Sequence, residues 1–129
     1  MSKNVTLLID MGKYKHVTLP LEDASKLLNM IADKLGKHTF DVEEAQRYIA
    51  NFDVFYDVMK KKFKDSLAPP KSINDMIRGN IIVDRIILIK ENEEKKVTIV
   101  FDRRVSIDKI REVLEELGYS VSIKRETSY

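Results

Sequence analysis

The sequence lacks cysteine and tryptophan, and it has little glycine or proline. Its 129 residues include Cys 0, Trp 0, Gly 4 and Pro 3. Without cysteine the chain cannot form disulfides, thiolate metal sites or a cysteine nucleophile. The only histidines, His16 and His38, match no known spacing of metal ligands. We therefore expect no metal site and no cofactor.

The chain also lacks a strong excess of charge and any long apolar run. Lys+Arg number 23 and Asp+Glu number 21, and so balanced a charge does not by itself require an anionic partner. Apolar runs such as 81–83 and 86–89 are too short for a membrane-spanning helix, so we expect no membrane partner. Residues 1–4 lead into a strand-like run without the apolar core of a signal peptide, which predicts a cytoplasmic location.

The composition is typical of one folded domain. Hydrophobic residues make up 43% and charged residues 34%, which predicts a single domain over residues 1–129. Lysine and glutamate dominate the charge, and Gln46 is the only glutamine. This pattern favours a thermophilic protein.

The first part of the chain predicts a β-hairpin followed by a helix. Residues 5–11 and 16–19 are rich in β-branched and aliphatic side chains and flank a Gly-containing connection, which predicts a hairpin within residues 1–20. Apolar residues at spacings of three and four then predict a helix over 21–35, which Gly36 ends.

A second, longer helix is predicted over Asp41–Ser66. Asp41 and Glu44 have the spacing of a capping box. A heptad-like stripe follows: Ala45, Ile49, Phe52, Tyr56, Met59 and Phe63. A helix of about 25 residues would be about 37 Å long, so we expect part of it to project and its stripe to need a partner. Packing of the stripe inside one chain is the equal alternative. The helices over 21–35 and 41–66 together are predicted to form a helical hairpin over residues 21–66.

The second part of the chain predicts a linker and a ββαβ unit. Residues 67–80 form the linker, in which a short helix runs from Ser72 to Ile77. The unit over residues 81–125 comprises strands 81–90 and 96–102, a helix that begins at Ser106 and ends at Gly118, and a strand over 120–124.

One segment resembles a known family. Lys95–Asp102 followed by Val105–Val121 is similar to the second half of the heavy-metal-associated domain of copper chaperones and metal-transporting ATPases. In that family a strand ending in an aromatic residue and Asp precedes a helix that closes on Glu-Leu-Gly-Tyr, as at 116–119. The resemblance covers about residues 85–123 and implies a ferredoxin-like layout. The family binds metal through an earlier Cys-x-x-Cys loop, which this chain lacks, so no metal activity is implied.

Together these elements predict an α+β fold. We expect a ferredoxin-like β-α-β-β-α-β sandwich in which the helix over 41–66 is an insertion. A competing layout keeps the helical hairpin as a separate layer.

The sequence carries no familiar catalytic motif. It has no Gly-rich phosphate loop, no Gly-x-Ser-x-Gly and no His-Glu-x-x-His. Asp84 and Arg85 interrupt an apolar strand, and such charges must be paired or functional because their burial is unfavourable. A site of Asp84 and Asp102 with a divalent metal is a minor alternative. We predict no catalytic residues.

The function predicted from the sequence is association. We expect a non-catalytic interaction protein that forms a homo-oligomer or serves as an accessory subunit of a larger assembly. Its predicted partner-binding residues are Ile49, Phe52, Tyr56, Met59 and Phe63.

The alternative function is nucleic-acid binding, because clustered cations beside aromatic rings suit a phosphate backbone. Its predicted residues are Lys60, Lys61, Lys62, Lys64, Arg103 and Arg104. The strand over 96–102 lacks the glycines and paired aromatics of the RNA-recognition signature, which disfavours recognition of RNA by that mode.

Overall fold

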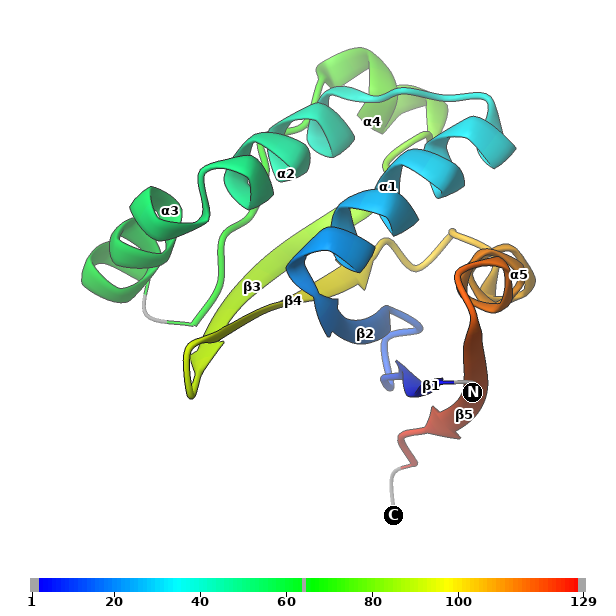
Figure 1. Cartoon of the computed structure of the whole chain (residues 1–129). Helices are drawn as coiled ribbons and strands as arrows, with labels where there is room; N and C mark the ends of the chain where they lie inside the picture. The colour runs from blue at the N-terminus through cyan, green and yellow to red at the C-terminus, as the bar shows by residue number, and fades with distance from the viewer. Residues whose placement is uncertain (1–2, 64, 128–129) are drawn as a thin grey trace.

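The computed structural model describes residues 3–63 and 65–127 and contains a five-stranded mixed sheet with helices on one face (Figure 1). The elements in chain order are β1 (Lys3–Ile9), β2 (Lys15–Pro20), α1 (Leu21–Leu35), α2 (Phe40–Ala50), α3 (Phe52–Val58), the π-helical turn η1 (Met59–Phe63), α4 (Ile73–Arg78), β3 (Val83–Glu91), β4 (Glu94–Phe101), α5 (Ile107–Glu116) and β5 (Tyr119–Arg125). The predicted α+β class is confirmed.

The strands lie in the order β3-β4-β2-β1-β5. β1 and β5 are parallel, and the other neighbouring pairs are antiparallel. The series β2-α1-β3-β4-α5-β5 has the predicted order of strands and helices. Both strands of the N-terminal hairpin join the sheet, so β1 lies between β2 and β5 as an added strand.

The core lies between the sheet and the helices. Alternate side chains of the inner strands, such as Leu7 and Ile99, are fully buried in the same core cluster as Leu28 of α1. Their neighbours, such as Thr6 and Thr18, face the side of the sheet that no helix covers in Figure 1. This period of two is what a sheet with one covered face requires.

The predicted single helix over 41–66 is wrong, because the segment is divided into α2, α3 and η1. The break lies at Asn51, whose φ of −115° and ψ of 46° are not helical. Its side-chain amide donates a 2.9 Å hydrogen bond to the carbonyl of Arg47, a local bond of the kind by which asparagine competes with the helical ladder. The chain therefore turns after α2 and stays close to the sheet.

Asp41 does not cap α2, contrary to the capping-box prediction. Thr39 occupies the N-cap position, and Asp41 is fully buried in the first turn. Its Oδ2 accepts hydrogen bonds from the backbone amides of Ile82, at 3.0 Å, and Val83, at 2.7 Å. One carboxylate thus joins the start of α2 to the start of β3 and satisfies two buried donors.

β5 is joined to α1 by a second carboxylate. The hydroxyl of Tyr119 donates to Oδ2 of Asp23, and Nζ of Lys3 lies 3.3 Å from the same oxygen. The hydrogen bond from Tyr119, followed by that from Lys3, holds the pKa of Asp23 below its usual range against the opposing effect of burial. Burial and this bond together raise the pKa of Tyr119.

We predict that Asp41→Ala lowers the free energy of unfolding by about 3 kcal/mol, because it leaves two buried amides without an acceptor. Urea unfolding followed by circular dichroism measures the change. Asp33→Ala is the control, because the Asp33 side chain is 71% exposed and its loss is expected to change stability by less than about 0.5 kcal/mol. Equal effects of the two substitutions would contradict the role given to Asp41.

We predict that Tyr119→Phe lowers the free energy of unfolding by about 1.5–3 kcal/mol at pH 7, the usual contribution of a hydrogen bond to a charged group. The pKa of Asp23 is lower in the folded than in the unfolded chain. The contribution of the ionised Asp23 to the free energy of unfolding is therefore complete above the unfolded pKa of about 3.9. It is lost as the pH falls through the folded pKa. Urea unfolding of dilute protein at several pH values should show the wild-type and variant curves converging in acid. A difference that stays constant with pH would refute this.

Candidate interaction surface

α4 is a short helix whose ends are fixed by local hydrogen bonds. Oγ of Ser72 accepts from the amide of Asp75 at the N-terminus. At the other end, Gly79 adopts the left-handed conformation with φ of 69°. The amide of Asn80 donates a hydrogen bond of 2.8 Å to the carbonyl of Asp75. Ser72 is the residue from which the sequence predicts this helix to begin, and Gly79 ends the helix in the structure. The Asp75 carboxylate also accepts from the amide of Phe40, which holds α4 beside the start of α2.

The large apolar side chains of α4 point to solvent. Exposed fractions are 74% for Ile73, 55% for Met76 and 77% for Ile77, and none of the helix's six residues, all of them described, is buried. Phe40, beside α4, is 43% exposed. Ile73, Met76 and Ile77 lie at i, i+3 and i+4 and therefore share one side of the helix. We call Phe40, Ile73, Met76 and Ile77 the α4 patch.

Sequence reasoning missed the α4 patch for a physical reason. The spacing of residues 73, 76 and 77 is the same as in a helix that buries one side. The available signal was the length of the helix. A segment of 6 residues between Pro-Pro and Gly is too short to be stable as an isolated helix, so caps or neighbouring elements must hold it.

The structure places the predicted partner-binding stripe mostly in the core. Ile49 is 3% exposed, Phe52 3% and Met59 1%, and Tyr56 is half-buried with its ring stacked 5.8 Å from that of Phe52. The side chain of Phe63 lies outside the described residues. Ile49, Phe52 and Met59 pack within their own chain, which is the equal alternative that the sequence left open. The break at Asn51 keeps the stripe against the sheet instead of letting the helix project.

The lysines of the alternative site that the structure describes lie together on η1. Lys60, Lys61 and Lys62 are exposed on η1, and Lys64 lies outside the described residues. Nζ of Lys60 lies 5.6 Å from the ring centre of Tyr56. The nearby carboxylate of Asp53 pairs with Lys90 at 3.2 Å and with Lys95 at 3.1 Å. These two hydrogen bonds, with Lys95 the larger effect, lower the pKa of Asp53.

The two basic clusters of the nucleic-acid alternative lie at opposite ends of the β3–β4 hairpin. Lys60 lines a depression of about 290 Å³ with Ile87–Glu91, near the turn of the hairpin. Arg103 and Arg104 follow the other end of β4, where Phe101 pairs with Val83. The 8 residues of β4 separate the clusters by about 27 Å at 3.4 Å per residue. The structure therefore does not bring the clusters into one surface.

Arg104 is also paired. Its Nε lies 3.0 Å from Oδ1 of Asp102, and this hydrogen bond raises the pKa of Arg104. The carbonyl of Arg103 accepts a hydrogen bond of 2.6 Å from Nζ of Lys15, a residue only 8% exposed. Burial lowers the pKa of Lys15, which the charge of Asp102 partly opposes. These contacts hold the loop after β4 on the sheet.

The uncovered face of the sheet carries a shallow depression of about 770 Å³. Its lining includes His16, Thr18, Lys96 and Thr98, and the two threonine hydroxyls are hydrogen-bonded at 2.7 Å. Tyr119 also lines it, but that residue is only 7% exposed and its hydroxyl is bound to Asp23 of α1. The other ring, that of His16, is 21% exposed and is bonded to Asp10, so this face offers little ring surface on which bases could stack.

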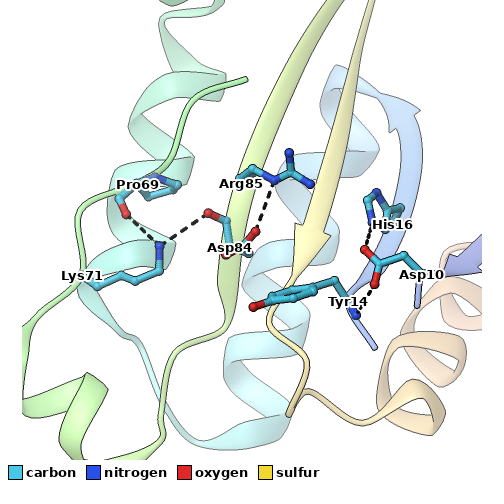
Figure 2. Close-up of polar contacts among 7 residues, drawn as sticks. All are labelled: Asp10, Tyr14, His16, Pro69, Lys71, Asp84 and Arg85. Carbon is cyan, nitrogen blue, oxygen red and sulfur yellow. Dashed lines mark hydrogen bonds and ion pairs between the residues drawn. The ribbon is translucent and has the colours of Figure 1, made fainter. Parts of the chain in front are cut away.

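The charged residues singled out in β3 and its surroundings have structural partners (Figure 2). Asp84 pairs with its neighbour Arg85 at 3.2 Å, and Lys71 donates to the carbonyl of Asp84. Asp102 pairs with Arg104, as described above. Among residues 3–63 and 65–127, no group of three or more His, Asp or Glu side chains could hold a metal ion.

Figure 2 also shows His16 and Asp10 at the β1–β2 turn. Nε2 of His16 lies 2.8 Å from Oδ2 of Asp10, whose Oδ1 accepts from the amides of Gly12 and Tyr14. Burial would raise the pKa of Asp10, but the hydrogen bonds from His16 and from the turn outweigh it and lower that pKa. This arrangement shapes the turn. His38 lies at the end of α1 and pairs with Asp33.

We predict that Ile73→Asp changes the free energy of unfolding by less than about 0.5 kcal/mol, because the side chain is largely solvated. Ile49→Ala should instead lower it by about 2–5 kcal/mol, since it leaves a cavity in the core. Guanidinium unfolding of both variants measures the contrast. A large loss in the α4 variant with little change in the stripe variant would contradict the placement of these two surfaces.

Comparisons with protein families, curated proteins and solved structures found no match to this chain. The resemblance of residues 85–123 to the heavy-metal-associated domain therefore stays a prediction. Within the described part of the chain, no helix is both long and apolar enough to cross a membrane.

Proposed function

We propose that this protein is a non-catalytic interaction protein, an accessory subunit that docks another protein chain through the α4 patch. The observation that carries the proposal is a capped helix that exposes three large apolar side chains, at 55–77%, and buries none of its residues. Neighbouring exposed apolar side chains are typical of protein-protein contacts.

The patch has the energetic character of a binding hot spot. Full burial of one isoleucine or methionine side chain contributes roughly 1.5–3 kcal/mol. Ile73, Met76 and Ile77 lie together on a helix already held in shape by Ser72 and Gly79. Docking them into a partner's groove therefore requires little ordering of this chain, which favours affinity.

The surroundings of the patch indicate the chemistry of the partner. Arg78 is exposed at the end of α4, and Lys37 and Arg104 lie beside Gly79 around a small depression. An apolar groove with an acidic rim would complement an apolar centre bordered by these cations.

The test is site-specific photo-crosslinking of the full chain in the cells that make it. A photoreactive phenylalanine analogue replaces Met76, and in a control it replaces Val54, which is 62% exposed on α3. We expect a discrete covalent adduct with one partner from position 76 and none from position 54. Ile73→Asp should lower the adduct yield roughly tenfold, equivalent to about 1.4 kcal/mol of lost contact.

The partner is then identified by mass spectrometry, and the adduct is reproduced with the two purified proteins. Failure to form an adduct from position 76, or equal yields from positions 76 and 54, would overturn the proposal.

A further inference from the structure

The two edges of the sheet differ in whether another described segment pairs with them. Beside β3, Leu67 exchanges two backbone hydrogen bonds of 2.8 Å with Ile86, which closes part of that edge. β5 pairs with β1 on one side, and on its outer side Figure 1 shows no other described strand. An exposed row of amides and carbonyls is a template for pairing with another strand.

The register with β1 defines which backbone groups of β5 are free. The amide of Lys3 donates to the carbonyl of Gly118, and the amide of Glu126 donates to the carbonyl of Ile9. In a parallel ladder alternate residues bond to one neighbour, so residues 118, 120, 122, 124 and 126 face β1. Tyr119, Val121, Ile123 and Arg125 therefore direct their amides and carbonyls to the outer edge.

We propose that β5 pairs with β5 of a second copy of this chain, antiparallel and with Ser122 opposite Ser122 across a two-fold axis. This register places Tyr119 opposite Arg125 and Val121 opposite Ile123. It uses all four outward-facing residues of both strands, for about eight new backbone hydrogen bonds. Shifting the centre by one residue either way leaves at least one of these residues unpaired within the strand.

The side chains are self-complementary in the same register. On the helix side, Ile123, which is 39% exposed, meets the half-buried Val121 of the second copy. Arg125 lies opposite Tyr119, which is 7% exposed and has Nζ of Lys3 4.5 Å from its ring centre. On the other side, Lys124 meets Ser120, and the small Ser122 side chains meet each other. No like charges lie directly opposite, although like charges are a common protection against edge pairing.

The pairing joins two five-stranded sheets into one continuous sheet. The helices of both copies stay on the same side, because the two-fold axis is perpendicular to the sheet. The α4 patch is not part of this contact, so the inference stands independently of the proposed function. If both hold, the dimer presents two α4 patches and can bind two partner chains or one partner twice.

The test uses the absence of cysteine in the chain. Opposite residues of a non-hydrogen-bonded antiparallel pair have Cα atoms about 4.5 Å apart, which permits a disulfide. Ser122→Cys should therefore give a disulfide-linked dimer under mild oxidation. Ser120→Cys is the matched control, because it changes an exposed serine on the same face that lies opposite Lys124. We expect its dimer to form at least about tenfold more slowly, since the two thiols are far apart.

Two further variants distinguish pairing through β5 from chance collisions of thiols and from contacts through the α4 patch. Ile123→Pro removes an outward-facing amide without removing a bond to β1, so combining it with Ser122→Cys should abolish the rapid disulfide while circular dichroism shows a folded chain. Ile73→Asp combined with Ser122→Cys should leave the rate unchanged, whatever becomes of the α4 patch.

Light scattering after size exclusion supplies the independent readout. The wild-type chain should be a dimer whose mass does not fall in high salt. A monomer at tens of micromolar, or equal disulfide rates for Ser122→Cys and Ser120→Cys, would overturn the proposal.

Discussion

The buried carboxylate of Asp41 is the constraint on which the arrangement of helices over β3 depends. It accepts hydrogen bonds from the amides of Ile82 and Val83 and so fixes the first turn of α2 against the start of a core strand. The amide of Phe40, one residue earlier, donates to Asp75 of α4. The position of the exposed α4 patch therefore follows from a contact in the core, through two short steps along the chain. A buried carboxyl oxygen that accepts two backbone hydrogen bonds provides orientation that apolar packing alone does not.

The two surfaces proposed for association differ in kind. The α4 patch consists of side chains and suits a groove lined with apolar groups. The outer edge of β5 consists mainly of backbone groups and suits another strand. Such surfaces can be occupied at the same time, because one lies beside the start of α2 and the other at the far edge of the sheet, beyond β1. The charged side chains of Asp84, Asp102 and His16 are held in ion pairs within the chain.

Much of the fold could be predicted from the sequence because its signals are local. Gly36 and Gly79 stop helices, Ser72 and Ser106 cap them, and the alternation in β4 defines a half-covered strand. The predictions that were wrong concern contacts between segments that are distant in the sequence. A carboxylate at position 41 has the spacing of a cap, and only the approach of β3 reveals its real partners.

The interaction surface was harder to predict than the fold. A heptad stripe has the same sequence pattern whether it packs against another chain or against its own sheet. The break at Asn51 keeps this stripe against its own sheet. The apolar residues of α4 carry the same ambiguity, but the structure leaves them exposed to solvent. The clusters of cations were visible in the sequence, but their separation by the length of the β3–β4 hairpin is a property of the register.

The central claim is that this chain associates through surfaces outside its helical stripe, and amide hydrogen exchange at low and high protein concentration tests it most directly. We expect Val121 and Ile123 to exchange fast when the protein is dilute and slowly when it is concentrated, while Ser120 and Ser122, bonded to β1, stay slow throughout. The amides of α2 and α3 should not respond to concentration. Concentration-dependent protection confined to α2 and α3, with Val121 and Ile123 always fast, would contradict the claim.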